Sequence, residues 1–153
     1  MNFVVNEWLP EYFKPNSLSH EKEKLEKFLN LFMNRNDVIY VRRPSAFNRK
    51  IHRYKKDFQN NLKVNGELGK FINLILLNSD KCVFVDDNDF VLNEEIPNKL
   101  RNAGNTISDL YLFEAASITE SKLIITTDGK LKKLFENDRV FKVELLDDFL
   151  KRY

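Results

Sequence analysis

Residues 123–131 read Leu-Ile-Ile-Thr-Thr-Asp-Gly-Lys-Leu, a short apolar run followed by a polar turn and the start of another apolar pattern. A continuous run of this kind is typical of a strand that is covered on both faces. Thr127 or Asp128 is expected to open a helix that continues to Phe135. A strand covered on both faces needs helices above and below it, so this stretch predicts an α/β fold.

Four further apolar runs are short enough to be strands, and they are Phe3 to Val5, Val38 to Val41, Cys82 to Val85 and Val140 to Val143. Between the runs lie segments with apolar residues at helical spacing, at about 20–34, 44–58, 67–77, 96–103, 109–119 and 145–150. Strands separated by helices pair in parallel, because each return connection must cross over the sheet. The chain is therefore predicted to be a three-layer α/β/α sandwich with a central parallel sheet of about five strands.

Length and composition favour one domain spanning residues 1–153. The chain has 42% hydrophobic residues and 13 Phe, which suffices for one sizeable core. Its longest apolar runs, such as Leu74 to Leu77, are far shorter than the roughly 20 residues that cross a bilayer. No secretory signal pattern follows the apolar start, so we expect a cytoplasmic protein. Cys82 is expected to be a buried strand residue.

Polar and acidic residues stand where the predicted strands end. In a parallel sheet, ligands gather outside the carboxyl ends of the strands. The candidates are Asn6 and Glu7 after the first strand, Asp86 and Asp87 after the third, Asp128 after the fourth, and Asp109 at the start of the helix that leads into the fourth. Converging carboxylates are suitable ligands for Mg²⁺ or Mn²⁺. Such an ion orients and deprotonates a water for attack on a phosphodiester.

A basic segment follows the second predicted strand. Residues 42–56 carry no acidic residue and seven cations, which are Arg42, Arg43, Arg49, Lys50, Arg53, Lys55 and Lys56. Arg42 and Arg43 should lie at the same sheet edge as the acids, with Arg49, Lys50 and Arg53 extending a track on the next helix. Such a track would bind a phosphate backbone without reading its sequence. The alternative is a solvated helix face, and the net charge of only +2 does not decide between them.

Two stretches of the chain carry a family resemblance. Ile107-Ser-Asp-Leu-Tyr-Leu-Phe-Glu-Ala-Ala116 and Leu123-Ile-Ile-Thr-Thr-Asp-Gly-Lys-Leu131 resemble the PIN-domain nucleases, which have an aspartate at a helix start followed by a strand ending in Thr-x-Asp. Asp109 and Asp128 match these two acids. The resemblance in strand order covers most of the chain, and its specific residues cover about a quarter.

Elsewhere the chain departs from the family pattern. Asn6 stands where the first strand normally ends in an aspartate, with Glu7 beside it. The family's glutamate on the helix after the second strand has no counterpart in 44–54, where Asn48 and Arg49 occupy the neighbourhood. The resemblance thus implies Asp109, Asp128 and Glu7 as catalytic and metal-binding residues, with Asn6 as a neutral oxygen ligand and Mg²⁺ or Mn²⁺ as the cofactor.

Three functions follow from these patterns. The leading hypothesis is a metal-dependent endonuclease, acting on RNA rather than DNA because the resemblance favours RNA. The second is a catalytically weakened PIN-like module that binds RNA. The third is a protein-interaction module, such as a toxin–antitoxin component, that binds a partner protein or a second copy of the chain.

Several of the same residues also have plain structural interpretations. Asp109 and Asp128 could serve only as helix caps. Asp86 and Asp87 are typical of a solvated turn. Glu114 is expected on a helix surface, and Trp8, Tyr12 and Phe13 are expected in the core rather than on a base-stacking platform.

Overall fold

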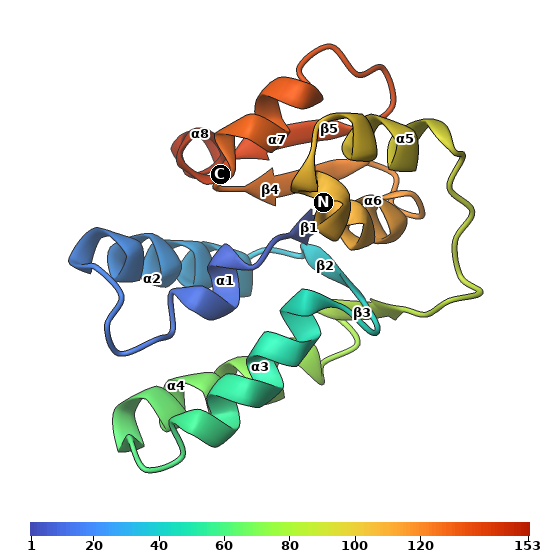
Figure 1. Ribbon diagram of the computed structural model, residues 1–153. Coiled ribbons are helices and arrows are strands. Elements are labelled where there is room, and N and C mark those ends of the chain that lie inside the picture. Colours follow the sequence, from blue (N-terminus) through green and yellow to red (C-terminus); the bar gives the residue numbers. More distant parts are fainter.

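The computed structural model describes the backbone of residues 1–153 and the side chains of residues 1–104 and 107–153. Its centre is a five-stranded sheet made of β1 (Asn2–Val5), β2 (Val38–Arg42), β3 (Cys82–Val85), β4 (Leu123–Thr126) and β5 (Lys142–Leu145). The strands follow the order β3-β2-β1-β4-β5, and every neighbouring pair is parallel (Figure 1). The predicted parallel sheet is confirmed.

Helices cover both faces of this sheet. They are α1 (Trp8–Glu11), α2 (Ser19–Met33), α3 (Ala46–Asp57), α4 (Leu62–Phe71), α5 (Glu95–Asn102), α6 (Leu110–Ala116), α7 (Gly129–Leu134) and α8 (Leu146–Arg152), with a π-helical turn η1 (Ile72–Leu76) and a 3-10 turn η2 (Asn105–Asp109). Helices α2 and α8 lie on one side of β1, and α5 and α6 lie on the other (Figure 1). The molecule is therefore a three-layer α/β/α sandwich, as the sequence predicts.

Phe3 is the centre of the aromatic core on the α2 and α8 side. Its side chain is fully buried in the middle strand β1. Its ring meets the rings of Phe28 and Phe32 from α2 and of Phe149 from α8, at centroid distances of 6.2, 6.0 and 5.4 Å. Edge-to-face contacts of this kind add to the free energy gained by burial. The first strand is thereby attached to two helices that are far apart in the sequence.

Short polar signals set the helix boundaries. The Ser45 hydroxyl accepts a hydrogen bond from Asn48 N–H and starts α3, and the Asn61 side chain accepts from Val64 N–H and starts α4. After α5 the chain turns at Gly104, whose φ of 97° suits a residue without Cβ. Asn61 explains why α4 begins five residues earlier than the hydrophobic spacing predicts.

The last strand and helix are displaced from their predicted positions. The sequence predicts a strand at 140–143, whereas β5 occupies Lys142–Leu145 and α8 follows it. Asp138 accounts for the shift, because its Oδ1 accepts hydrogen bonds from Val140 N–H and Phe141 N–H at 2.9 and 2.8 Å. These bonds hold the backbone in a turn where the apolar pattern alone indicates a strand.

Two further expectations can be compared with the structure. Cys82, Trp8 and Phe13 are buried, as predicted, whereas Tyr12 is only partly buried and packs against the core. Burial also raises the pKa of the Cys82 thiol to about 12. In the part of the chain that the structure describes, every helix is too short or too polar to cross a membrane.

We predict that Phe3→Ala lowers the free energy of unfolding by about 3–5 kcal/mol, because it removes a buried ring and leaves a cavity between α2 and α8. Urea denaturation monitored by circular dichroism measures the loss. Leu62→Ala is the matched control: Leu62 is 87% exposed, and its truncation should change stability by no more than about 0.5 kcal/mol. Equal effects of the two substitutions would contradict the central place of Phe3.

Candidate active site at the carboxyl edge of the sheet

The strand order defines one special place in the sheet. The chain moves outward from β1 through β2 to β3 and then returns to the other side of β1 with β4 and β5. The direction of progress thus reverses between β1 and β4, and ligands of parallel α/β sheets bind outside the carboxyl ends at such a point. Asn6 and Glu7 follow β1 there, and Asp128 follows β4.

Asn6 joins the two strand ends. Its amide nitrogen donates to Thr126 Oγ1 at 2.7 Å, and its amide oxygen accepts from Trp8 N–H at 3.3 Å. Asp128 N–H donates to the same Thr126 hydroxyl oxygen at 3.0 Å. The amide oxygen that the sequence analysis assigns to a metal ion is therefore engaged in the backbone turn, and Asn6 acts here as a bridge between β1 and β4.

Asp128 caps the N-terminus of a helix, which is the structural role that the sequence also allows for it. Its Oδ1 accepts hydrogen bonds from Lys130 N–H and Leu131 N–H at 2.8 and 3.2 Å, which starts α7. Its other oxygen, Oδ2, takes part in neither bond. Capping thus fixes the carboxylate beside the end of β4 without using both of its oxygens.

Asp109 lies at the junction of η2 and α6, and its environment is unfavourable for a charge. Among the described residues its side chain makes no capping hydrogen bond with α6. Burial, together with the smaller effects of the negative charges of Asp128 and Glu7, raises the pKa of Asp109 from 3.8 to about 6. Asp128 and Glu7 therefore lie near enough to Asp109 for their charges to act on it.

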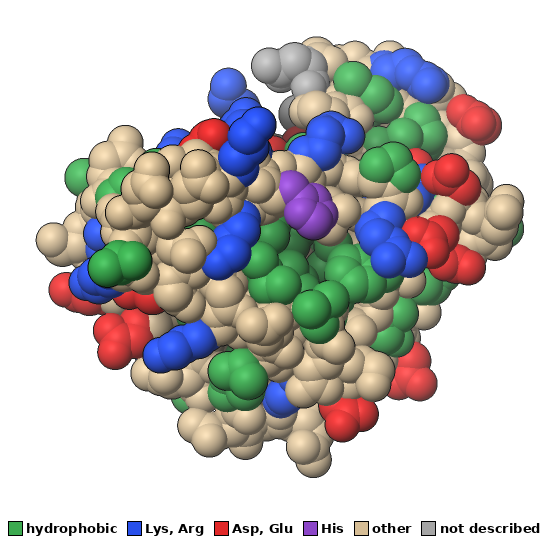
Figure 2. Space-filling model, turned by 90° about the horizontal axis from the view of Figure 1, so that it is seen from below, with side chains coloured by type: hydrophobic (Ala, Val, Ile, Leu, Met, Phe, Trp, Pro, Cys, Tyr) green, Lys and Arg blue, Asp and Glu red, His purple; other side chains and the backbone are tan. Residues whose placement is uncertain are grey.

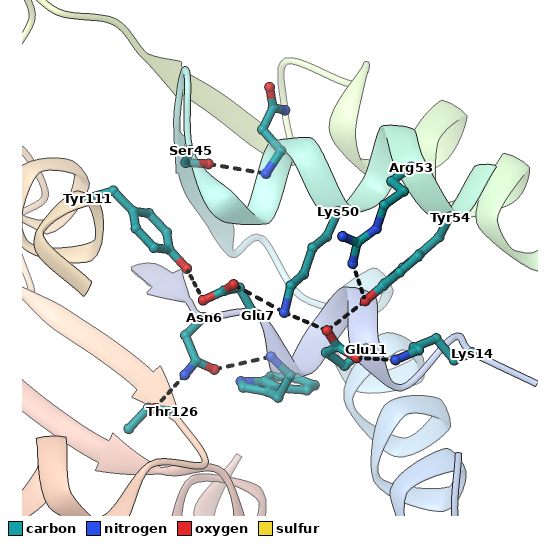
Figure 3. A network of polar contacts seen from close by, with 12 residues as sticks. Asn6, Glu7, Glu11, Lys14, Ser45, Lys50, Arg53, Tyr54, Tyr111 and Thr126 are labelled. Atoms are coloured by element: carbon teal, nitrogen blue, oxygen red, sulfur yellow. Dashed lines mark hydrogen bonds and ion pairs between the residues drawn. The ribbon is translucent and has the colours of Figure 1, made fainter. Parts of the chain in front are cut away.

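Glu7 is held by two neighbours. One oxygen, Oε1, lies 3.2 Å from Lys50 Nζ, and the other, Oε2, accepts from the Tyr111 hydroxyl at 3.3 Å (Figure 3). Burial and the adjacent Glu7 raise the pKa of Tyr111, so this phenol stays protonated and remains a donor. Among the described residues, no group of three or more His, Cys, Asp or Glu side chains stands ready to hold a metal ion.

The expectation that Arg42 lies on an open basic surface is wrong. Its side chain is 8% exposed and forms ion pairs with Glu114 at 2.8 Å and with Asp87. Its guanidinium also lies over the Phe90 ring. Glu114 is correspondingly not a free helix-surface residue, since only 19% of its side chain is exposed. A charge pair at this depth joins α6 to β2 and to the turn after β3.

The remaining cations divide into paired and open ones. Arg43 donates two hydrogen bonds to Asp86, which lies in the predicted turn. Lys50 points inward to Glu7 and to Glu11 rather than outward. Arg49 and Arg53 are exposed on α3. On the face over α3 and α4, Lys and Arg side chains are spread among hydrophobic and acidic ones instead of forming one block (Figure 2).

Glu11, Tyr54 and Tyr111 belong to this site but are not among the site residues that the sequence predicts. A signal was present, because Glu7 and Glu11 are one helical turn apart, and so are Lys50 and Tyr54. Glu11 accepts from Tyr54 at 2.6 Å and pairs with Lys50 at 2.5 Å (Figure 3). Two acids on one segment and two donors on another, at the same spacing, indicate contact only when the two segments are known to pack together. Here α1 packs against α3.

Comparison with known proteins yields no match to a protein-family model, to a curated protein or to a solved structure.

We predict that Glu11 makes the protein more stable above about pH 4.5 than below it. Burial alone would raise the pKa of Glu11, but hydrogen bonds from Lys50, Tyr54 and Lys14 outweigh burial and lower it from 4.5 to about 2. A carboxyl with a lowered folded pKa contributes stability above its unfolded pKa and loses it as the pH falls toward 2. Glu11→Gln should lower the free energy of unfolding by about 1 kcal/mol at pH 7, allowing for solvent screening, and by much less at pH 2.

Urea unfolding at a series of pH values measures this difference. Glu26→Gln is the control, since Glu26 is exposed and forms no ion pair among the described residues. A constant difference between wild type and Glu11→Gln at all pH values would contradict the assignment.

Proposed function

We propose that the protein is a metal-dependent endonuclease that hydrolyses phosphodiester bonds, with RNA as the substrate. The observation that carries the proposal is that Asp109, Asp128 and Glu7 stand at the switch point, where burial and, to a smaller extent, the charges of Asp128 and Glu7 raise the pKa of Asp109 to about 6. Carboxylates kept together against repulsion are typical of functional sites. The preference for RNA rests on the resemblance to PIN-domain nucleases.

The donor set has the chemistry that Mg²⁺ or Mn²⁺ requires. Asp109 and the free oxygen of Asp128 would hold the ion, with Glu7 as a third oxygen donor. The bound ion would supply Lewis-acid polarisation of the phosphate and a more acidic water. Glu7, already oriented by the Tyr111 hydroxyl, would either be that third donor or accept the proton that the attacking water loses as its oxygen bonds to phosphorus. The bond from phosphorus to the departing oxygen would break, and that oxygen would take up a proton from solvent water.

Arg49 and Arg53 are suited to bind the phosphate backbone beside this edge. They stand four residues apart on α3 and therefore on one face of the helix. Arg49 is close enough to Tyr111 for its charge to lower the pKa of that phenol, and Tyr111 contacts Glu7. The exposed arginines therefore lie along α3 with Arg49 at the end near the acids, so a nucleic-acid strand bound by α3 would pass the site.

We predict Mn²⁺-dependent cleavage of single-stranded RNA that falls at least about 100-fold in Asp109→Asn and in Asp128→Asn. Asn keeps the capping oxygen of residue 128 while it removes the charge, so α7 should stay folded. Gel electrophoresis of end-labelled RNA, with and without EDTA, measures the rate. Asp138→Asn is the matched control, because Asp138 also caps a turn but lies before β5, at the opposite edge of the sheet. Cleavage that survives EDTA, or both site substitutions, would reject the proposal.

A second candidate function is RNA binding without cleavage. It is favoured by two departures from the family pattern, Asn6 in place of an aspartate and no acid in 44–54, and by the lack of a preformed metal cluster among the described residues. RNA binding with no cleavage in Mg²⁺ or Mn²⁺ would establish this candidate instead.

RNA binding by either candidate should depend on the open arginines. We predict that Arg49→Ala and Arg53→Ala each reduce the slope of log affinity against log salt by about 0.7, the value for one lost phosphate contact on a single strand. Fluorescence anisotropy of labelled RNA in metal-free buffer gives the slopes. Arg139→Ala, an exposed arginine before β5, should leave the slope unchanged. An unchanged slope in both α3 variants would show that α3 does not bind the backbone.

A further inference from the structure

Arg43 is held at the end of β2 by a single carboxylate. Its Nε and Nη2 atoms donate hydrogen bonds to Asp86 Oδ1 and Oδ2 at 3.0 and 2.7 Å. Its guanidinium also lies over the Phe84 ring, with Cζ 4.4 Å from the ring centroid. A planar guanidinium binds two oxygens of a phosphate in the same way as those of a carboxylate. The Arg43 side chain is therefore already oriented for an oxyanion with two adjacent oxygens.

The pairing of the strands places Arg43 beside the acids of the candidate site. Phe3 pairs with Ile39 in the register of β1 with β2. Continued to the strand ends, this register brings the backbone of Arg43 level with that of Glu7. The ladder extends past the end of β2, because Arg43 N–H donates to a carbonyl oxygen at the end of β3 at 2.8 Å. Neighbouring strands lie about 4.8 Å apart, so a nucleic acid that passes Glu7 comes within reach of the Arg43 side chain.

The carboxylate that pairs with Arg43 is open to solvent. The side chains of Arg43 and Asp86 are 46% and 53% exposed, whereas that of Arg42 is 8% exposed. Exposed ion pairs contribute little to stability, because water and salt screen them. The turn that carries Asp86 is held by other bonds: Asp86 N–H donates to Asp89 Oδ2 at 2.7 Å, and Asp89 N–H donates to Asp86 O at 3.1 Å. The Asp86 carboxylate can therefore leave Arg43 while the turn stays folded.

We propose that Arg43 binds a phosphate of the RNA backbone, and that the Asp86 carboxylate occupies the place of this phosphate until RNA displaces it. The two carboxylate oxygens accept the hydrogen bonds that two phosphate oxygens would accept. Asp86 thus weakens RNA binding, because its bonds to Arg43 must break and its charge repels the backbone. The inference deepens the proposed function and rests on the RNA binding that both of its candidates share.

The test is fluorescence anisotropy of labelled single-stranded RNA with the full chain, in metal-free buffer at low salt. Asp86→Ala should bind RNA about three- to fivefold more tightly than wild type, the range for the loss of one exposed ion pair. This gain should vanish when Arg43→Ala is added, so that the double variant binds RNA as Arg43→Ala alone does. Arg43→Lys combined with Asp86→Ala should keep only part of the gain, because an ammonium lacks the planar pair of donors.

Asp80→Ala is the matched control. Asp80 is an exposed acid that precedes β3, whereas Asp86 follows it, so the two substitutions change the net charge equally at opposite edges of the sheet. Among the described residues Asp80 forms no ion pair, and Asp80→Ala should bind RNA as wild type does. Circular dichroism and thermal unfolding of each variant show that it is folded.

Each outcome decides the inference. A gain in Asp86→Ala that Arg43→Ala abolishes supports it. No gain in Asp86→Ala, an equal gain in Asp80→Ala, or a gain that persists with Arg43→Ala overturns it and leaves the proposed function in place. A gain that depends on Arg43, in a protein that cleaves no RNA with Mn²⁺, supports the inference and rejects the nuclease. No RNA binding by any of these proteins overturns the inference and both candidate functions.

Discussion

The parallel pairing of β1 between β2 and β4 is the constraint on which the rest of the structure depends. Phe3, Val4 and Val5 are buried because helices cover both faces of this strand. Since β1 is central and its neighbours run in the same direction, the residues after β1 and β4 must emerge side by side. Asn6 and Thr126 join these two ends by a hydrogen bond, so Glu7 and Asp128 follow two neighbouring strands in the middle of the sheet.

The charges at this edge fall into three groups with different roles. Arg42 with Glu114 is a largely buried structural link, to which the exposed Asp87 adds a second carboxylate, and removing Glu114 would leave the Arg42 charge poorly compensated. Lys50 with its two glutamates is a half-buried link between α1 and α3. In the third group, burial and the charge of Asp128 raise the pKa of Asp109, and neither acid forms an ion pair with a cation in the part of the chain that the structure describes.

Much of the fold could be predicted because its signals are local. Apolar runs of four residues located β3 and β4 to the residue, and helical spacing located α2 and α3. The errors came from short polar interactions that compete with the hydrophobic pattern. Asp138 delays β5 by forming a turn, and Asn61 extends α4 backward by capping it. A pattern of apolar residues contains no information about which single side chain will hold the backbone.

The amino-acid sequence by itself determined the layer architecture and the acids Glu7, Asp109 and Asp128, because strand ends and helix starts can be read from neighbouring residues. Only the tertiary structure decided which charged side chains are exposed and which are buried or paired. Arg42, Arg49 and Lys50 belong to one basic segment, yet one is buried, one is exposed and one lies between two glutamates. The carboxylate partners of Arg42 and Lys50 lie between 39 and 72 residues away in the chain, and packing alone brings such groups together.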